Sequence, residues 1–312
     1  MWKTLIRKEL NDPRNGLSYY EGFYDLFDIN QEDKVIKYNA IYKKEKIQIE
    51  MKAQVLEEEI LETEYMNKQG IAYKRRNEDD LDNVMNVKKM LIDIYVNDCK
   101  VSEDSIYEGQ LRYIVNSKPM NTDDNNIIYI SPARHTTGAM YLNAILDNSE
   151  MYEQMLAVLK EYDDDIISIN YDNTVIAGST KGVYKILTKS HKKALPLNVY
   201  GDGMKKAVLL MSAVIAAKNG ILLIDEFETA IHTSAMNKTF SWIIDMCIKF
   251  NVQIFMTSHS KEAIDKLLKC SPKYIDSIAV YTLSKRENGT VVRRLAGDKA
   301  IDVQDNMGLE LR

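Results

Sequence analysis

A run of apolar residues that ends in two acids constrains the fold of this chain more than any other feature. Residues 220–226 read Gly-Ile-Leu-Leu-Ile-Asp-Glu, and a continuous apolar run indicates a strand of a parallel sheet that is buried on both faces. Ligands of open α/β sheets bind at the carboxyl ends of the strands. Asp225 would there face a bound Mg²⁺, and Glu226 could polarise a water that attacks a γ-phosphate. Taken alone, a buried strand that ends in a solvated acidic turn explains the run equally well.

A turn with two glycines precedes this strand. Gly201, Asp202 and Gly203 are followed by helical periodicity over residues 205–218. Glycines let backbone amides approach a phosphate closely, and a helix that begins at such a turn directs its N–H groups and its dipole toward an anion. An ordinary turn before a helix is the simpler interpretation of this segment by itself. As a surface turn it is expected to tolerate a bulky residue at Gly203.

A second apolar strand follows downstream and ends in polar residues. Residues 252–256 are mostly apolar and lead into Thr257, Ser258 and His259. The intervening residues 239–250 have the pattern of an amphipathic helix. Strand, helix and strand predict a parallel βαβ unit, which brings both polar termini to one edge of the sheet. A histidine at that edge could bond a γ-phosphate, although a structural histidine at a strand end would explain it alone.

The order and spacing of these segments resemble those of the ABC-type ATPases. Within that class the chain looks most like the overcoming-lysogenization-defect branch, which is related to the SMC and RecF-like ATPases. The resemblance covers residues 127–312. It implies an α/β P-loop NTPase fold with a mixed sheet and flanking helices, the ligands ATP and Mg²⁺, and a homodimer that sandwiches nucleotide between its protomers.

The resemblance also implies roles for the first two motifs. Gly201, Asp202 and Gly203 match the signature turn, which contacts nucleotide bound on the opposite protomer. Residues 221–226 match the Walker B strand. In that match Asp225 is the Mg²⁺ residue and Glu226 is the catalytic base.

The remaining motifs match in the same way. Residues 228–232, which end at His232, match the D-loop segment beside the nucleotide. Residues 257–259 match the switch loop. Ser258 is there expected to contact nucleotide, and His259 is expected to sense the γ-phosphate.

The phosphate-binding loop of such an ATPase does not occur in the sequence. No segment matches G-x-x-x-x-G-K-[ST], and the nearest imitation, Gly-Ser-Thr-Lys-Gly at residues 178–182, has the wrong order. In the resembling family this loop lies near the amino terminus, so residues 1–10 are interpreted as the tail of its helix. Either Met1 is an internal methionine of a longer protein, or the subunit has lost hydrolysis. The presence of Asp225, Glu226 and His259 favours the longer protein.

Patterning along the chain predicts three segments. Residues 1–54 are interpreted as a β-rich remnant of the amino-terminal ATPase lobe with an antiparallel meander. Residues 55–120 are interpreted as an inserted helical arm, because their apolar residues recur at helical spacing, as in Val84, Val87, Met90, Leu91 and Ile94. Residues 121–312 form the carboxyl-terminal ATPase lobe with the four motifs.

Composition restricts the classes of function and location. The net charge is −5, with 41 Lys and Arg against 46 Asp and Glu, so there is no global basic surface for nucleic acid, although a local basic patch is compatible with these numbers. The three scattered cysteines have no metal-ligand spacing and indicate reduced thiols in a cytoplasmic protein. No apolar run reaches the about 18 residues that a membrane span needs.

The leading functional hypothesis is an ATP-binding and ATP-hydrolysing switch subunit. It would act with a trans effector such as a nuclease, and could act on DNA, in phage defence or DNA maintenance. The 312 residues by themselves are expected to be inactive without a phosphate-binding loop. The alternative hypothesis is a non-hydrolysing scaffold or regulatory subunit on the same fold. A nuclease activity of the chain itself is poorly supported, because the sequence shows no acidic metal-binding cluster beyond Asp225, Glu226 and Glu228.

Overall fold

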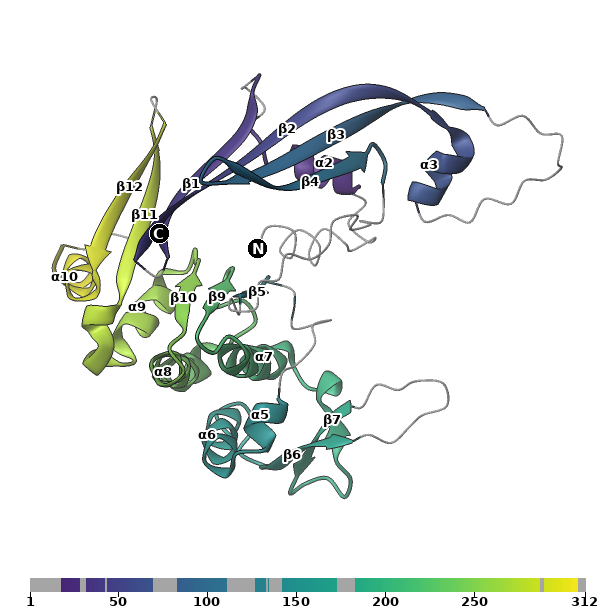
Figure 1. The fold of residues 1–312 in the computed structure, drawn as a ribbon. Coiled ribbons are helices and arrows are strands. Elements are labelled where there is room, and N and C mark those ends of the chain that lie inside the picture. Colours follow the sequence, from purple (N-terminus) through teal and green to yellow (C-terminus); the bar gives the residue numbers. More distant parts are fainter. Residues whose placement is uncertain are drawn as a thin grey trace. The chain divides into compact units, whose positions relative to one another are not determined.

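The computed structural model describes residues 18–28, 32–42, 44–69, 83–110, 127–132, 134, 142–172, 183–286 and 289–307. The chain divides into two compact units, Met1–Thr122 and Asp123–Arg312, whose elements are labelled in Figure 1. In the described residues no helix is both long enough and apolar enough to cross a membrane. The expected helix tail at residues 1–10 and the glycine segment at residues 178–182 lie outside the described residues.

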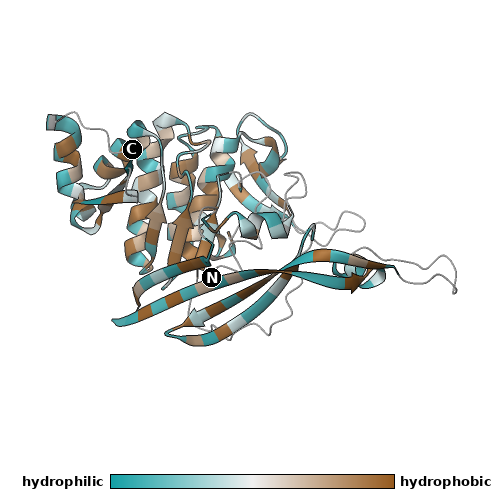
Figure 2. Cartoon of the chain, turned by 90° about the horizontal axis from the view of Figure 1, so that it is seen from above, coloured by the Kyte–Doolittle hydropathy of each residue, from teal (hydrophilic) through white to brown (hydrophobic). Residues whose placement is uncertain are grey.

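The first unit is a four-stranded antiparallel meander. Its strands β1 (Lys34–Tyr42), β2 (Glu45–Leu61), β3 (Val84–Val96) and β4 (Cys99–Tyr107) pair in sequence order. Helices α2 (Tyr19–Tyr24) and α3 (Glu62–Lys68) belong to the same unit. Apolar and polar residues alternate along its strands, as the brown and teal bands in Figure 2 show, because successive side chains point to opposite faces of a sheet. The antiparallel meander predicted near the amino terminus is therefore confirmed.

The helical arm predicted for residues 55–120 is wrong for the described residues 55–69 and 83–110, most of which lie in strands. Met90 and Val87 both lie in β3, which pairs with β2 on one side and with β4 on the other. Met90 packs against α2 on one face, whereas Val87 packs with Ile60 and Tyr65 in a separate cluster. A strand with apolar contacts on both faces carries apolar residues at both odd and even positions, and this pattern imitates helical spacing. Strand β2 also runs without a break across the predicted boundary at residue 54.

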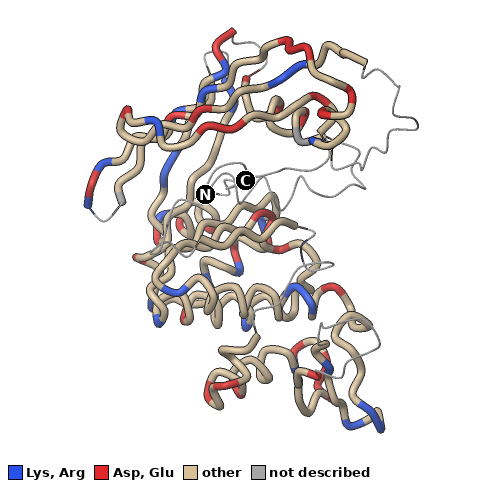
Figure 3. Tube along the Cα trace, turned by 45° about the vertical axis from the view of Figure 1, so that its right-hand side comes forward, with Lys and Arg blue, Asp and Glu red and all other residues tan. Residues whose placement is uncertain are grey.

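Several charged side chains on the meander form ion pairs with neighbours of opposite charge. Figure 3 shows Lys and Arg interspersed with Asp and Glu along these strands. The Glu50 carboxylate forms ion pairs with Lys37 at 2.8 Å and with Lys52 at 3.1 Å, and Lys89 forms one with Glu58 at 2.8 Å. Cross-strand pairs of opposite charge stabilise a sheet modestly and specify its register. The acidic run Glu57-Glu58-Glu59 thus lies on strand β2, within the segment predicted to be a helical arm.

Three short parallel strands form the centre of the second unit. They are β5 (Ile127–Ile130), β9 (Ile221–Ile224) and β10 (Gln253–Met256), in the order β10-β9-β5. Their register aligns Ile130, Ile224 and Met256 at one edge. Helix α8 (Thr233–Lys249) connects β9 with β10. The predicted parallel βαβ unit is confirmed, and so is the α/β class of this part of the chain.

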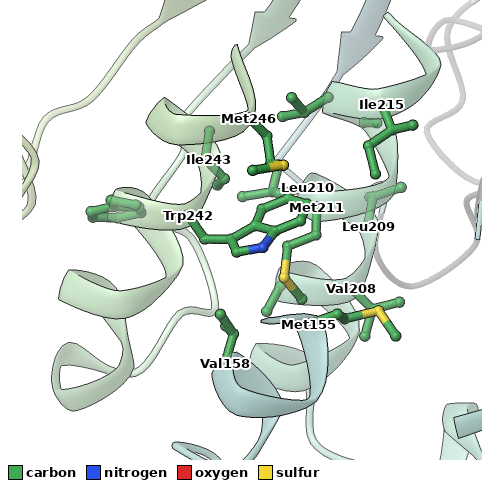
Figure 4. Close-up of a cluster of buried hydrophobic side chains, with 14 of the residues drawn as sticks. Met155, Val158, Val208, Leu209, Leu210, Met211, Ile215, Trp242, Ile243 and Met246 are labelled. Carbon is green, nitrogen blue, oxygen red and sulfur yellow. The ribbon is translucent and has the colours of Figure 1, made fainter. Parts of the chain in front are cut away.

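Helices cover this sheet and bury one large apolar core. Helix α7 (Asp202–Ala216) is buried from Ala207 to Ile215 on all its faces, as expected for a helix in the interior of a domain. It packs against α8 and against α6 (Ser149–Leu159). Figure 4 shows this packing, with Trp242 of α8 beside Met211 of α7 and Met155 of α6.

The remaining elements surround this core. They are α5 (Asn143–Leu146), the antiparallel sheet of β6 (Ile166–Asp172), β7 (Val183–Thr188) and β8 (Leu195–Pro196), the 3₁₀ turns η2 (Leu197–Val199) and η3 (Pro272–Ser277), α9 (Lys261–Lys269), the hairpin of β11 (Ala279–Arg286) and β12 (Gly289–Ala296), and α10 (Gly297–Met307). Leu268 of α9 packs with Ala300 and Val303 of α10 in a small separate cluster.

Because α7 lies in the core, shortening one of its buried side chains is expected to lower the stability of the protein strongly. Leu210→Ala removes a fully buried side chain, and the free energy of unfolding is expected to fall by about 2–5 kcal/mol in urea denaturation. Ile248→Ala is the matched control, because Ile248 is 49% exposed on α8. Equal losses in the two variants would show that α7 is not part of the core.

Candidate functional site

Polar residues from β9 and β10 meet at the carboxyl edge of the sheet. The hydrogen-bond ladder of the parallel sheet continues one residue past β9 and one past β10. The Asp225 amide donates to the Ile130 carbonyl at 2.9 Å, and the Thr257 amide donates to the Ile224 carbonyl at 3.0 Å. The Thr257 hydroxyl donates a hydrogen bond to Oδ1 of Asp225. The two strand ends that the sequence placed at one edge are therefore in direct contact.

Glu226 is held in an uncommon backbone conformation. Its φ is 44°, a left-handed value that non-glycine residues adopt rarely and that occurs preferentially at functional sites. Its amide donates to the Thr257 hydroxyl at 3.0 Å, and its Oε2 accepts from the Thr229 hydroxyl at 3.3 Å. The single hydroxyl of Thr257 thus bonds both residues: it donates to the Asp225 carboxylate and accepts from the Glu226 backbone amide.

Glu228 joins the segment after β9 to the segment after β10. Its Oε1 accepts hydrogen bonds from the Ser258 hydroxyl at 2.7 Å and from the His259 amide at 3.3 Å. The Ser258 hydroxyl also accepts from the Ser260 amide at 2.9 Å. Ser258, expected to face nucleotide, is therefore engaged with the protein itself. The sequence placed Glu228 in the segment matched to the D-loop and in the acidic group with Asp225 and Glu226, but no local pattern signals its contact with Ser258 and His259.

The two histidines expected at the site have different surroundings. His259 is exposed just beyond β10, where its ring is accessible. His232 caps the amino end of α8, where its Nδ1 accepts from the Ser234 amide at 3.4 Å and lies 2.9 Å from the Ser234 hydroxyl. A side chain at this position satisfies a backbone donor that the helix leaves free. His232 thus has a structural role in the chain as it stands.

The two glycines of the predicted signature turn differ from each other. Gly201 caps α7 and has open space where a Cβ atom would be. A Cβ on Gly203 would lie 2.7 Å from the Ala230 carbonyl oxygen and 3.3 Å from Cε1 of Tyr162. Gly203 lies in the first turn of α7, next to Asp202, and glycine lets the helix approach the segment after β9. The expectation that this position tolerates a bulky residue is wrong, because backbone from another segment occupies the space.

Lys206 is a charged residue near the acids that sequence analysis missed. Its side chain is fully buried, and its Nζ donates to the Pro132 carbonyl at 3.4 Å. Burial lowers the pKa of this lysine from its ordinary 10.5 to about 8. The negative charges of Glu228, Asp225 and Glu226 oppose that shift. One signal in the sequence could have indicated that Lys206 is buried. The helix α7 is apolar on all sides, so a polar residue within it has no solvent-facing side to occupy.

The oxygen atoms of this site suit Mg²⁺. Magnesium in nucleotide-binding proteins takes one or two carboxylates together with phosphate oxygens and water. In Asp225 the Oδ1 atom accepts the hydrogen bond from Thr257, and the Oδ2 atom takes no part in that bond. Across the described ranges no three His, Cys, Asp or Glu side chains are close enough to hold a metal ion by themselves. The residues therefore fit an ion that arrives with a phosphate ligand.

The chain matches a model of a known protein family. The family model described as "AAA domain, putative AbiEii toxin, Type IV TA system" matches residues 74–265, more than half of the chain. An ATP/GTP phosphatase of Helicobacter pylori is 32% identical over 129 residues, which are 40% of this chain and 33% of that protein. The chain thus spans only a third of that relative's length. An uncharacterized protein of Methanocaldococcus jannaschii is 31% identical over 113 residues, which are 36% of this chain and 98% of that protein.

Solved structures give more distant similarities. An SMC head bound to the C-winged helix domain of ScpA has a TM-score of 0.41 at 11% identity, over 81% of this chain and 76% of that one. The SMC head domain from Thermotoga maritima has a TM-score of 0.35 at 9% identity, over 80% of this chain and 74% of that one. Because these TM-scores are low, the structural similarities carry no argument. The assignment of the chain to a family rests on the match to the family model, and its α/β fold class rests on the parallel βαβ unit.

The packing of Gly203 predicts a difference between two alanine substitutions. Gly203→Ala should lower the free energy of unfolding by about 1–3 kcal/mol, because the new methyl group meets backbone that cannot move aside without strain. Gly201→Ala should stay within about 0.5 kcal/mol of the wild type, since its site is open. Urea denaturation compares the two variants, and equal values would refute the close approach of α7 to residue 230.

The pKa of Lys206 predicts a pH dependence of stability. The unfolded chain binds a proton at Lys206 up to a pKa near 10.5, and the folded chain only up to about 8. Between these values the unfolded state binds more protons, so this group's contribution to stability rises with pH. The free energy of unfolding of the wild type minus that of Lys206→Met should therefore increase from pH 8 to 10 in urea denaturation. A flat difference would show that Lys206 titrates as an ordinary exposed lysine.

Proposed function

The chain belongs to the family whose model is described as "AAA domain, putative AbiEii toxin, Type IV TA system", and we propose that it is the hydrolysing switch subunit of an ABC-type ATPase. The proposed catalytic centre lies at the carboxyl ends of β9 and β10. The observation that supports it most is the hydroxyl of Thr257, which bonds both Asp225 and the amide of Glu226. This contact joins the two motifs that the reaction needs.

Each residue of the site has a proposed role. Glu226 accepts a proton from the attacking water, and the Thr229 hydroxyl at 3.3 Å orients its carboxylate. Asp225 holds Mg²⁺, which when bound neutralises phosphate charge in the reaction. His259 is exposed and accessible to a γ-phosphate. Ser258 is assigned to the positioning of this histidine, because Glu228 binds its hydroxyl.

The active form is proposed to be a homodimer. Gly201 is exposed at the start of α7 with free space beside it, and the amides there can face the phosphates of nucleotide held by a second protomer. The amino end of a helix attracts anions by its dipole. Asp202 pairs with Lys205 at 2.5 Å, which partly neutralises the acid at this position. His232 is assigned to the same interface through the segment that ends at the start of α8.

The wider biological role is proposed by family analogy. It comprises a trans effector such as a nuclease, action on DNA, and phage defence or DNA maintenance. A cytoplasmic location is proposed because Cys99, Cys247 and Cys270 are free thiols.

A non-hydrolysing scaffold is the second candidate. The observation that favours it is the lack of a G-x-x-x-x-G-K-[ST] segment in the 312 residues. Without the amides and the lysine of that loop, the principal phosphate contacts of such a site are missing. The proposed reaction therefore requires a phosphate-binding loop outside these residues.

Substitution of the two acids tests the proposed reaction. The 312-residue chain alone is expected to show no measurable ATP hydrolysis and only weak nucleotide binding. In a form that carries a phosphate-binding loop, Glu226→Gln should retain ATP binding and lower turnover by about 100-fold or more, because it removes the base. Asp225→Ala should weaken the binding of Mg²⁺-ATP itself.

The control variant is Glu262→Gln, which changes an exposed acid on α9 outside the site. Phosphate release and equilibrium nucleotide binding are the two measurements. Turnover within about threefold of the parent for both site variants would refute the assignment, since loss of a catalytic base costs far more. Failure of every loop-bearing form to hydrolyse ATP would favour the scaffold.

A further inference from the structure

Lys206 is a buried charge that the proposed reaction does not use. It lies in the second turn of α7 with no exposed surface, and the Pro132 carbonyl accepts a hydrogen bond from its Nζ at 3.4 Å. A charged ammonium group in the interior is costly unless opposite charges lie near it. The acids whose charges act on it are Glu228 first, and then Asp225 and Glu226. All three belong to the segment that follows β9.

Glu228 is the acidic counterpart of Lys206, because one of its carboxylate oxygens is also buried. Its Oε1 binds the Ser258 hydroxyl and the His259 amide, whereas its Oε2 is buried and has no hydrogen-bond partner among the residues that the structure describes. An ionised carboxylate with a buried and unpaired oxygen is unfavourable by itself. A nearby positive charge removes much of that penalty. Lys206 supplies that charge, because its side chain is fully buried and Glu228 is the acid that acts most strongly on it.

We propose that Lys206 and Glu228 are positioning residues that hold the switch segment, Ser258 and His259, in place. The charge of Lys206 keeps the Glu228 carboxylate turned inward, and that carboxylate fixes the Ser258 side chain and the His259 backbone. The inference rests on the proposed function, because it assigns a role within the same site. It also connects α7, the helix that begins at the proposed signature turn, with the histidine proposed to sense phosphate in the same protomer.

A role of Lys206 in packing alone is the competing explanation. Lysine buries a long apolar stem, so loss of that stem could disturb α7 and its neighbours without any effect of charge. Methionine has a similar length and no charge, and Lys206→Met therefore removes the charge while it retains most of the volume. If charge is what matters, neutralising Glu228 as well should undo the effect of Lys206→Met. If packing is what matters, it should not.

The experiment is a double-mutant cycle on the 312-residue chain without nucleotide. The variants are Lys206→Met, Glu228→Gln and the two combined. The readouts are the NMR resonance and the hydrogen-exchange rate of the His259 amide. Glutamine retains an oxygen that accepts hydrogen bonds from Ser258 and His259. Lys205→Met is the matched control, because Lys205 is the neighbouring lysine in α7 and pairs instead with Asp202.

Lys206→Met should shift the His259 resonance and speed exchange of its amide by about tenfold, because local protection depends on the bond to Glu228. Glu228→Gln alone should have a small effect. The double variant should return to within about threefold of the wild-type rate, a coupling that packing would not produce. Lys205→Met should leave the amide unchanged.

Two results would overturn the proposal. One is an unchanged His259 amide in Lys206→Met. The other is a double variant that exchanges as fast as Lys206→Met alone. Should Lys206→Met fail to fold, a folded double variant would support the charge interaction, and failure of both would refute it. No nucleotide is present, so these outcomes are independent of whether the chain hydrolyses ATP.

Discussion

The hydrogen bonds of the Thr257 hydroxyl hold the candidate site together. This group follows β10, and it bonds two consecutive residues that follow β9. The geometry depends on the parallel register of the strands, which aligns Ile224 with Met256 and so places the next residue of each strand side by side. A shift of this register by one residue would turn the Thr257 side chain to the other face of the sheet and separate it from both acids.

The close packing of α7 is the second condition for this arrangement. Gly203 allows the start of the helix to approach the Ala230 carbonyl, and the helix is buried on every side from Lys206 to Ile215. That burial brings Lys206 close to the acids that follow β9. The same contacts that stabilise the core therefore determine the electrostatic surroundings of the site. The core and the candidate site share residues here, because the site lies where a buried helix, a buried strand and the exposed carboxyl end of the sheet meet.

Local patterns predicted the second unit well and part of the first unit poorly. In the second unit, α7, α8, β9 and β10 lie where apolar runs and helical periodicity indicated. In the first unit β3 has apolar contacts on both faces, so Val87 and Met90 share a spacing that a helix would also produce. Periodicity distinguishes helix from strand only where one face is polar. The pairing partners β2 and β4 decided the structure, and they are distant in sequence.

The sequence by itself determined the motif order, the parallel βαβ unit and the placement of Asp225, Glu226 and the switch residues at one edge, because strand ends and helix starts follow from local composition. Only the tertiary structure decided what those residues contact. The bonds of Glu228 to Ser258 and His259 join segments 30 residues apart, and the burial of Lys206 depends on the packing of α7. Such contacts arise when distant elements pack together, and no local pattern of residues encodes them.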